Sequence, residues 1–210
     1  MSRKIKKNIT KGNRTTLPIK DNKKMLSVIE YWKIQYLKST TTSSKNKAYR
    51  NYMLCLLGFN TAFRAEDLLQ LRVKNLIKGY VSIKESKTGK PQNFALNKKI
   101  FMEIQEYVKN LDLTALDYIF FSYRPSDSKP LSRPGANKIL NKAGEYAKLH
   151  QQFSCHSMRK TFAYHFYESG GNLLTLQKML NHSSPMTTLI YINWDTTDAE
   201  NARLNTHFGV

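Results

Sequence analysis

The stretch HSMRKTFAYHF, residues 156–166, does most to indicate the fold. His156 and Arg159 stand three residues apart at the start of a predicted helix, so their side chains share a face and can converge on a small anion. Phe162, Ala163 and Phe166 form an apolar flank that buries the opposite side of the helix and directs the pair into a cleft. A His-x-x-Arg pair alone marks a solvated helix face more often than a site, so its interpretation depends on the rest of the chain.

Toward the carboxyl end, the pattern predicts helices over 156–169 and 173–181 and a short helix that begins at Ser184-Pro185. Ser as N-cap followed by Pro at the first helical position is a strong start signal. His182 follows the second of these helices, where it is equally well explained as a partner of the helix dipole. Tyr191 lies on the short helix, and a tyrosine in an apolar stretch is usually part of the core.

Toward the amino end, helical spacing predicts helices from about Met25 to Leu37, after an N-cap at Asp21, and from about Lys47 to Phe59. The second is apolar on most faces and leads to Arg64, which begins a further helix to Leu71. Asp67 lies one turn after Arg64, close enough to hold its guanidinium. A surface ion pair between these two residues is the simpler alternative.

Between residues 79 and 96 the apolar period changes to two, which predicts a β-hairpin with Lys87 in its turn. Hairpin lysines commonly serve only solubility. Two more helices, from about Asn97 to Asn110 and up to about Leu149, complete a fold that we expect to be mainly α, with one small antiparallel sheet.

The charge of the chain indicates a polyanionic partner. It has 34 Lys and Arg against 15 Asp and Glu, a net charge of +19 over 210 residues. Nucleic acid is the leading candidate, and we expect the basic residues 1–19 to be a flexible arm. Such an arm could follow a DNA backbone, and a solvated tail with no defined role is an equal alternative. The sequence has no apolar run of the roughly 18 residues that span a bilayer, no signal peptide and no metal-ligand cluster. We therefore expect a cytoplasmic protein with no cofactor and no metal, in which Cys55 and Cys155 are reduced.

The polar residues at these positions suit one reaction, the attack of a phenol on a phosphodiester. Two arginines can hold the non-bridging oxygens of a phosphate, histidines and a lysine can transfer protons, and a tyrosine can become covalently attached. The candidate catalytic residues are Arg64, Lys87, His156, Arg159, His182 and Tyr191, with Asp67 in support.

These residues and their neighbours resemble the tyrosine recombinase (phage integrase) family from about Pro18 to Trp194. The matching pieces are TAFRAEDLLQLR (61–72), SKTG (86–89), HSMRKTFA (156–163) and LQKMLNHSS (176–184) with Thr187, Thr188 and Tyr191. The resemblance implies a catalytic domain over 20–194 that cuts and rejoins double-stranded DNA at specific sites. It also implies a homotetramer on paired sites, accessory DNA-bending proteins as possible partners, and a tail, 195–210, that packs on a neighbouring subunit.

The resemblance further implies a role for each residue. Arg64 and Arg159 hold the scissile phosphate, and Asp67 supports Arg64. Lys87 protonates the departing 5′ oxygen, His156 accepts the tyrosine proton, His182 donates to a non-bridging oxygen, and Tyr191 forms a 3′-phosphotyrosyl bond. Neither metal nor ATP is needed, because the two arginines offset the charge and the ester keeps the bond energy.

Three departures from the family pattern stand out. Ala62 and Asn181 replace glycines; Ala is tolerable unless its backbone needs a positive φ, whereas Asn accepts a left-handed helix stop. Only about twenty residues precede the first predicted helix, so we expect either a fragment or a short member that resembles fimbrial-switch invertases.

Two alternatives stay open, a type IB topoisomerase-like enzyme and a DNA-binding regulator that does not cut. The sequence leaves the target site open, and also the choice among integration, excision, inversion and resolution.

Overall fold

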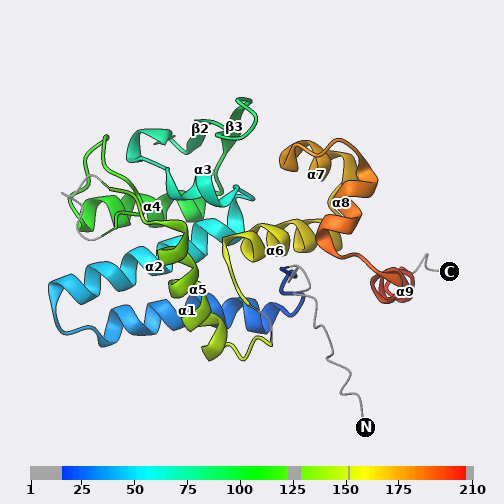
Figure 1. Ribbon diagram of the computed structural model, residues 1–210, viewed down its shortest axis with the longest axis horizontal. Helices are drawn as coiled ribbons and strands as arrows, with labels where there is room; N and C mark the ends of the chain where they lie inside the picture. Colours follow the sequence, from blue (N-terminus) through cyan, green and yellow to red (C-terminus); the bar gives the residue numbers. More distant parts are fainter. Residues whose placement is uncertain (1–15, 123–128, 151, 207–210) are drawn as a thin grey trace, which may run out of the picture.

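The computed structural model describes residues 16–122, 129–150 and 152–206 (Figure 1). It is mainly helical with one small antiparallel sheet, which confirms the expected fold class. The elements are α1 (Asn22–Lys38), α2 (Thr42–Asn60), α3 (Ala65–Leu69), the 3₁₀ turn η1 (Val73–Asn75), β1 (Leu76–Ile77), β2 (Tyr80–Lys84), β3 (Pro91–Ala95), α4 (Lys98–Asn110), α5 (Arg133–Tyr146), α6 (Cys155–Glu168), α7 (Leu173–Leu180), α8 (Pro185–Ile192) and α9 (Thr196–Leu204).

The long helices α1 and α2 lie side by side, with α5 across α1 and α6 against α2 (Figure 1). Asp21 caps α1 as predicted, because its carboxylate accepts from the backbone N–H groups of Lys23 and Lys24. α2 begins earlier than predicted, since the Thr41 hydroxyl accepts from the Ser44 N–H and starts the helix inside the Ser/Thr-rich segment. Most faces of α2 are buried, so it forms the centre of the larger core.

The three strands form a sheet in the order β1-β2-β3, each antiparallel to its neighbour. Val81 pairs with Leu76 on one side and Phe94 on the other, and it is fully buried. Because side chains alternate along a strand, Ile83 and Glu85 follow Val81 on its inward face. Glu85 stands one residue past β2 and is itself buried, so the end of this strand carries a carboxylate into the interior.

A second, smaller core joins α6 to α7 and α8. It contains Ala62, Ala163, Leu176, Leu180 and Ile192. Each helix end has a local cause: Ser154 and Ser184 cap the starts of α6 and α8, and Asn181 ends α7 in the left-handed conformation, with φ 53° and ψ 40°. The expectation for Asn181 is therefore confirmed. This core sets the distance between α6 and α8, which carry the two halves of the candidate site.

The two ends of the described chain meet on α6. The Ile19 N–H donates to Thr161, and the Ile19 carbonyl accepts from His165, so the chain is already fixed at residue 19. Helix α9 was not predicted; its buried Asp198 accepts from Lys20 and from the Tyr164 hydroxyl. Residues 1–15 of the expected basic arm lie outside the described residues, and packing of the tail on another subunit stays a prediction. Within the described ranges, every helix is too short or too polar to cross a bilayer.

Candidate active site

Arg159 is the buried cation at the centre of the site. Its side chain projects from the start of the second turn of α6, just after the capping box formed by Ser154 and Ser157. The residue is 3 % exposed, and its two terminal nitrogens donate to the carbonyls of Ala62 (2.6 Å) and Leu180 (2.9 Å). No ion pair joins Arg159 to a carboxylate in the described part of the chain. A guanidinium buried in this way, with carbonyls as its hydrogen-bond partners, favours the binding of an anion.

Arg64 lies next to Arg159, at the start of α3. Its Nη2 donates to the same Leu180 carbonyl at 3.4 Å, so the two guanidinium groups converge on one oxygen atom. Leu180 is the last residue of α7, where carbonyls lack helical partners and the helix dipole is negative. The end of α7 therefore draws two cations together, although their mutual repulsion opposes this arrangement.

Arg64 is paired with Glu85, whereas we expected Asp67 to be its partner. Its Nη1 lies 2.5 Å from the Glu85 carboxylate, whose side chain is fully buried. Burial raises the pKa of Glu85, but hydrogen bonds from Thr88 and Asn181 and the charge of Arg64 outweigh it, so the pKa lies below its usual value. Asp67 instead accepts from the Ser86 backbone N–H at 2.8 Å. Asp67 thus holds the hairpin turn, because its position on α3 faces the end of β2.

The other departure from the family pattern, Ala62, adopts a strained backbone. Its φ is 55°, a left-handed value that glycine accepts more easily than alanine. This conformation belongs to the segment that presents the Ala62 carbonyl to Arg159. The strain therefore lies at the point where the buried arginine is held.

Tyr191 lies on α8 with its ring between two imidazoles. Its ring centroid is 5.2 Å from that of His156 and 4.9 Å from that of His182, and both contacts are edge-on. The hydroxyl is buried and makes no hydrogen bond of normal geometry within the described residues. Burial raises the pKa of Tyr191 to about 12, although the charge of Arg159, the close approach of its guanidinium to the hydroxyl and the charge of Arg64 lower it in part. A buried phenol with an unused donor, beside two arginines, is placed to meet a phosphate.

The two histidines are neutral at pH 7. His156 is exposed as a whole residue, but partial burial of its imidazole beside Tyr191, together with the charges of Lys160 and Arg159, lowers its pKa to about 4. Burial and the charges of Arg159 and Arg64 lower the pKa of His182 to about 4 as well. His182 is also oriented, because its Nδ1 lies 3.1 Å from the Thr188 hydroxyl. Thr188 is fully buried, so this hydrogen bond is kept from solvent.

Lys87 is exposed in the turn between β2 and β3, as the sequence predicts. In the described ranges no hydrogen bond or ion pair joins it to the other candidate residues. Its neighbours Glu85 and Ser86 contact Arg64 and Asp67, so the base of the turn is fixed to the site while the side chain of Lys87 is exposed. The structure thus brings five of the six candidate residues together and leaves Lys87 at the rim.

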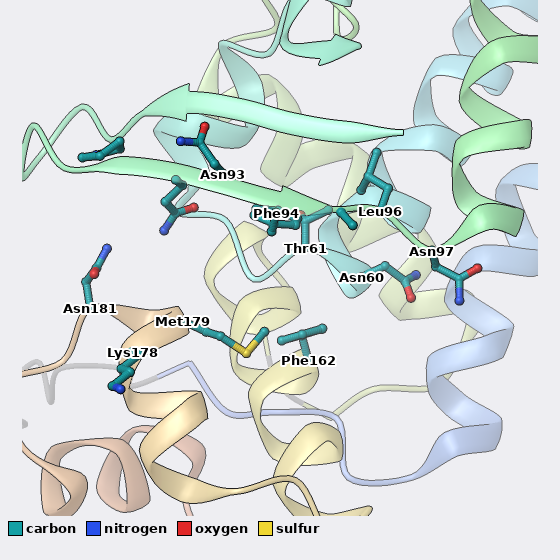
Figure 2. Close-up of a pocket in the computed structure, with 13 residues that line it drawn as sticks. Asn60, Thr61, Asn93, Phe94, Leu96, Asn97, Phe162, Lys178, Met179 and Asn181 are labelled. Carbon is teal, nitrogen blue, oxygen red and sulfur yellow. The ribbon is translucent and has the colours of Figure 1, made fainter. Parts of the chain in front are cut away.

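Two hollows lie beside these residues. One, of about 350 Å³, is lined by His182, Asn181, Lys178 and Lys90, which makes it a basic entrance to the site. The other, of about 440 Å³, lies between β3 and α7, and Figure 2 shows Phe94 and Met179 on its facing walls. Among the described residues, no cluster of His, Cys, Asp and Glu side chains has a geometry that could hold a metal ion.

Sequence reasoning missed three residues of the site: Glu85, Thr188 and Lys160. Glu85 could have been found from the sequence, because the period of two in β2 places it on the same inward face as Val81. Lys160 could also have been found, since it follows His156 by four residues on the same helix face. Its ammonium lies 5.1 Å from the centre of the Tyr191 ring. Thr188 was named only as part of the family pattern, and its contact with His182 could not be predicted, because that contact depends on how α8 turns back.

Comparisons with known proteins agree with this geometry. The model of the phage integrase family matches residues 18–197. The probable integrase/recombinase YoeC of Bacillus subtilis is 40 % identical over 151 residues, which are 71 % of this chain and 81 % of YoeC. The tyrosine recombinase XerD of Staphylococcus haemolyticus is 28 % identical over 185 residues, 85 % of this chain and 61 % of XerD.

Solved structures show the same fold. The XerH site-specific recombinase bound to palindromic difH substrate superimposes with a TM-score of 0.69 at 23 % identity, over 94 % of this chain and 55 % of XerH. The Tn1549 transposon integrase in complex with transposon right end DNA gives a TM-score of 0.61 at 16 % identity, over 93 % of this chain and 68 % of the integrase. The chain therefore belongs to the phage integrase family. Within that family it is a tyrosine-type site-specific recombinase, and neither the topoisomerase nor the regulator alternative is favoured.

Proposed function

We propose that this chain cleaves and rejoins double-stranded DNA through a covalent bond between Tyr191 and a 3′ phosphate. The observation that carries the proposal is the convergence of Arg64 and Arg159 on the Leu180 carbonyl, beside the buried hydroxyl of Tyr191. A scissile phosphate that entered here would meet two cations and a phenol whose O–H donor is unused, since the nearby Arg159 can only donate to it. The net charge of +19 and the basic hollow beside His182 suit a DNA backbone.

In the proposed reaction the Tyr191 oxygen attacks phosphorus, and the bond from phosphorus to the 5′ oxygen breaks. His156 accepts the phenolic proton, and Lys87 gives a proton to the departing 5′ oxygen. Because the pKa of Tyr191 is about 12 and that of His156 about 4, the free protein keeps the phenol protonated. The proton therefore leaves only as the new O–P bond forms, while both arginines stabilise the charge on the non-bridging oxygens.

His182 donates to a non-bridging oxygen in this scheme, which fixes its tautomer. The hydrogen must be on Nε2, so Nδ1 must accept from the Thr188 hydroxyl at 3.1 Å, in place of the longer bond of that hydroxyl to the Ser184 carbonyl at 3.5 Å. In the second half of the reaction, a free 5′ hydroxyl attacks the phosphotyrosyl bond and Tyr191 recovers its proton. The energy of the original ester is kept in the covalent bond, so the reaction needs no ATP, and the two arginines supply the positive charge that a metal ion would otherwise provide.

Full recombination would pair two DNA sites in a homotetramer, with accessory DNA-bending proteins as further partners. We also propose a cytoplasmic location, where the DNA would be reached. Asp67 would act in this scheme by fixing the turn that carries Lys87, through its hydrogen bond to Ser86.

The test is trapping of the covalent bond. The protein is mixed with a pool of DNA duplexes that have randomised cores and one nick. After cleavage near the nick a short fragment diffuses away, and its loss prevents rejoining. We expect a denaturant-resistant adduct in EDTA that is absent in Tyr191→Phe and retained in Tyr146→Phe, a control at an exposed tyrosine. Sequencing of the trapped DNA would give the site. Absence of an adduct in the wild type, or a requirement for divalent metal, would count against the proposal.

A further inference from the structure

Lys160 is a cation within the site that none of the proposed steps uses. It is half-buried, and in the described ranges it has no carboxylate partner. Its ammonium lies 5.1 Å from the centre of the Tyr191 ring, within the distance at which a cation is attracted to an aromatic face. Burial lowers the pKa of Lys160, so part of its hydration has already been lost.

The contact with Lys160 completes the surroundings of the Tyr191 ring. His156 and His182 contact the ring edge-on, and the ammonium of Lys160 approaches it from α6. Tyr191 lies on an eight-residue helix, and the small apolar core also packs this helix against α6. A change in χ1 of Tyr191, or a shift of α8, would displace the hydroxyl from the arginines, and a small displacement of a reacting atom costs a large part of the rate.

We propose that Lys160 is a positioning residue for cleavage, which holds the ring of Tyr191 against α6 so that the hydroxyl faces the phosphate. This inference rests on the proposed function. Lys160 has a second effect through His156, which stands four residues before it on the same face of α6. A positive charge there disfavours protonation of the imidazole and keeps it able to accept the tyrosine proton.

The charged and titratable groups that face His156 are few. Arg159 and Lys160 lie on its own helix, Arg133 on α5, His182 after α7 and Tyr191 on α8. All the charged members of this set are cations, and Lys160 contributes more than either arginine. Removal of the Lys160 charge should therefore raise the pKa of His156, and the acidic limb of the pH–rate profile should move to higher pH with it.

The experiment measures single-turnover adduct formation on the trapped duplex for Lys160→Met, Lys160→Arg and the control Lys109→Met. Lys109 is an exposed cation on α4, so its loss reproduces the change in net charge alone. We expect Lys160→Met to form adduct about tenfold more slowly than the wild type, while it binds the duplex as tightly as the control does. The acidic limb of its pH–rate profile should lie at higher pH than that of the wild type. Lys160→Arg should stay within about threefold of the wild type, because it keeps the cation over the ring.

Three results would overturn the inference: a Lys160→Met rate within twofold of the wild type, an unmoved acidic limb, or loss of duplex affinity beyond the control. The last would make Lys160 a contact of the DNA backbone. Failure of the wild type to form any adduct would instead refute the proposed function, so the two failures are distinguishable. Circular dichroism of each variant would report whether it folds, and rescue by Lys160→Arg separates the charge from the packing of the side chain.

Discussion

The ion pair between Glu85 and Arg64 gives a stability prediction with a definite size. Glu85→Gln removes the negative charge but keeps a side chain of the same shape that can still bond to Thr88 and Gln92. Removal of one partner of a buried pair costs about 3–5 kcal/mol. The Arg64 side chain keeps 23 % exposure, and water can solvate part of its charge. We therefore expect a loss of about 2–3 kcal/mol in the free energy of unfolding, and a Tm lower by about 4–12 °C.

Urea unfolding followed by tryptophan fluorescence would measure this loss. The midpoint should fall without a change in the slope m, since the surface exposed on unfolding stays the same. The matched control is Glu66→Gln, which removes an exposed carboxylate from α3 and should change stability by less than about 0.5 kcal/mol. If Glu85→Gln were as stable as this control, the view that the Glu85 carboxylate holds Arg64 in place would be wrong.

The same variant has a pH signature. The pKa of Glu85 is lowered in the folded protein, so its contribution to stability is present above the usual carboxyl pKa and is lost as the pH falls through the lowered value. The difference in stability between wild type and Glu85→Gln should therefore be constant near neutral pH and shrink in acid. A difference that stayed constant down to pH 2 would contradict the assignment of the charge.

Three further predictions concern the backbone, the carboxyl end and the histidines. Ala62→Gly should change stability by less than about 1 kcal/mol, because relief of roughly 1–2 kcal/mol of strain offsets the lost methyl burial and the added freedom of the unfolded chain. Asp198→Asn should release α9 and raise hydrogen exchange in residues 196–204 by about tenfold or more, because the bonds from Lys20 and Tyr164 weaken. The pKa values of His156 and His182 are both about 4 in the folded protein, below the ordinary value of about 6.5 in the unfolded chain. Between these two values the unfolded chain binds more protons than the folded protein, so the free energy of unfolding should fall as the pH drops from about 6.5 to 4.

Controls follow from the same contacts. Ala62→Val should lose more than about 2 kcal/mol, since a β-branched residue at φ 55° is more strained than alanine; equal stability of the Gly and Val variants would refute the strain. Glu200→Gln, on the exposed side of α9, should leave exchange unchanged. His182→Gln should flatten the slope of stability against pH, and an unchanged slope would show that folding does not lower the pKa of His182.

Much of the fold could be predicted because its signals are local. The cap at Asp21, the period of two in the hairpin, the left-handed stop at Asn181 and the start at Ser184 each depend on residues within one turn. The start of α2 was missed because a Ser/Thr-rich segment suits a turn and a capped helix equally. Helix α9 was missed because its anchor, Asp198, is satisfied by Lys20 and Tyr164, which are distant in the sequence.

The sequence alone determined which chemical groups the site has and in what order they occur. The spacing of His156 and Arg159, the turn before His182 and the step to Tyr191 are matters of helix geometry. Only the tertiary structure decided that Arg64 pairs with Glu85, that both arginines meet at the carbonyl of Leu180, and that Lys160 contacts the tyrosine ring. The physical reason is that a buried charge takes whichever partner the packing of distant elements brings within reach, and sequence spacing does not contain that distance.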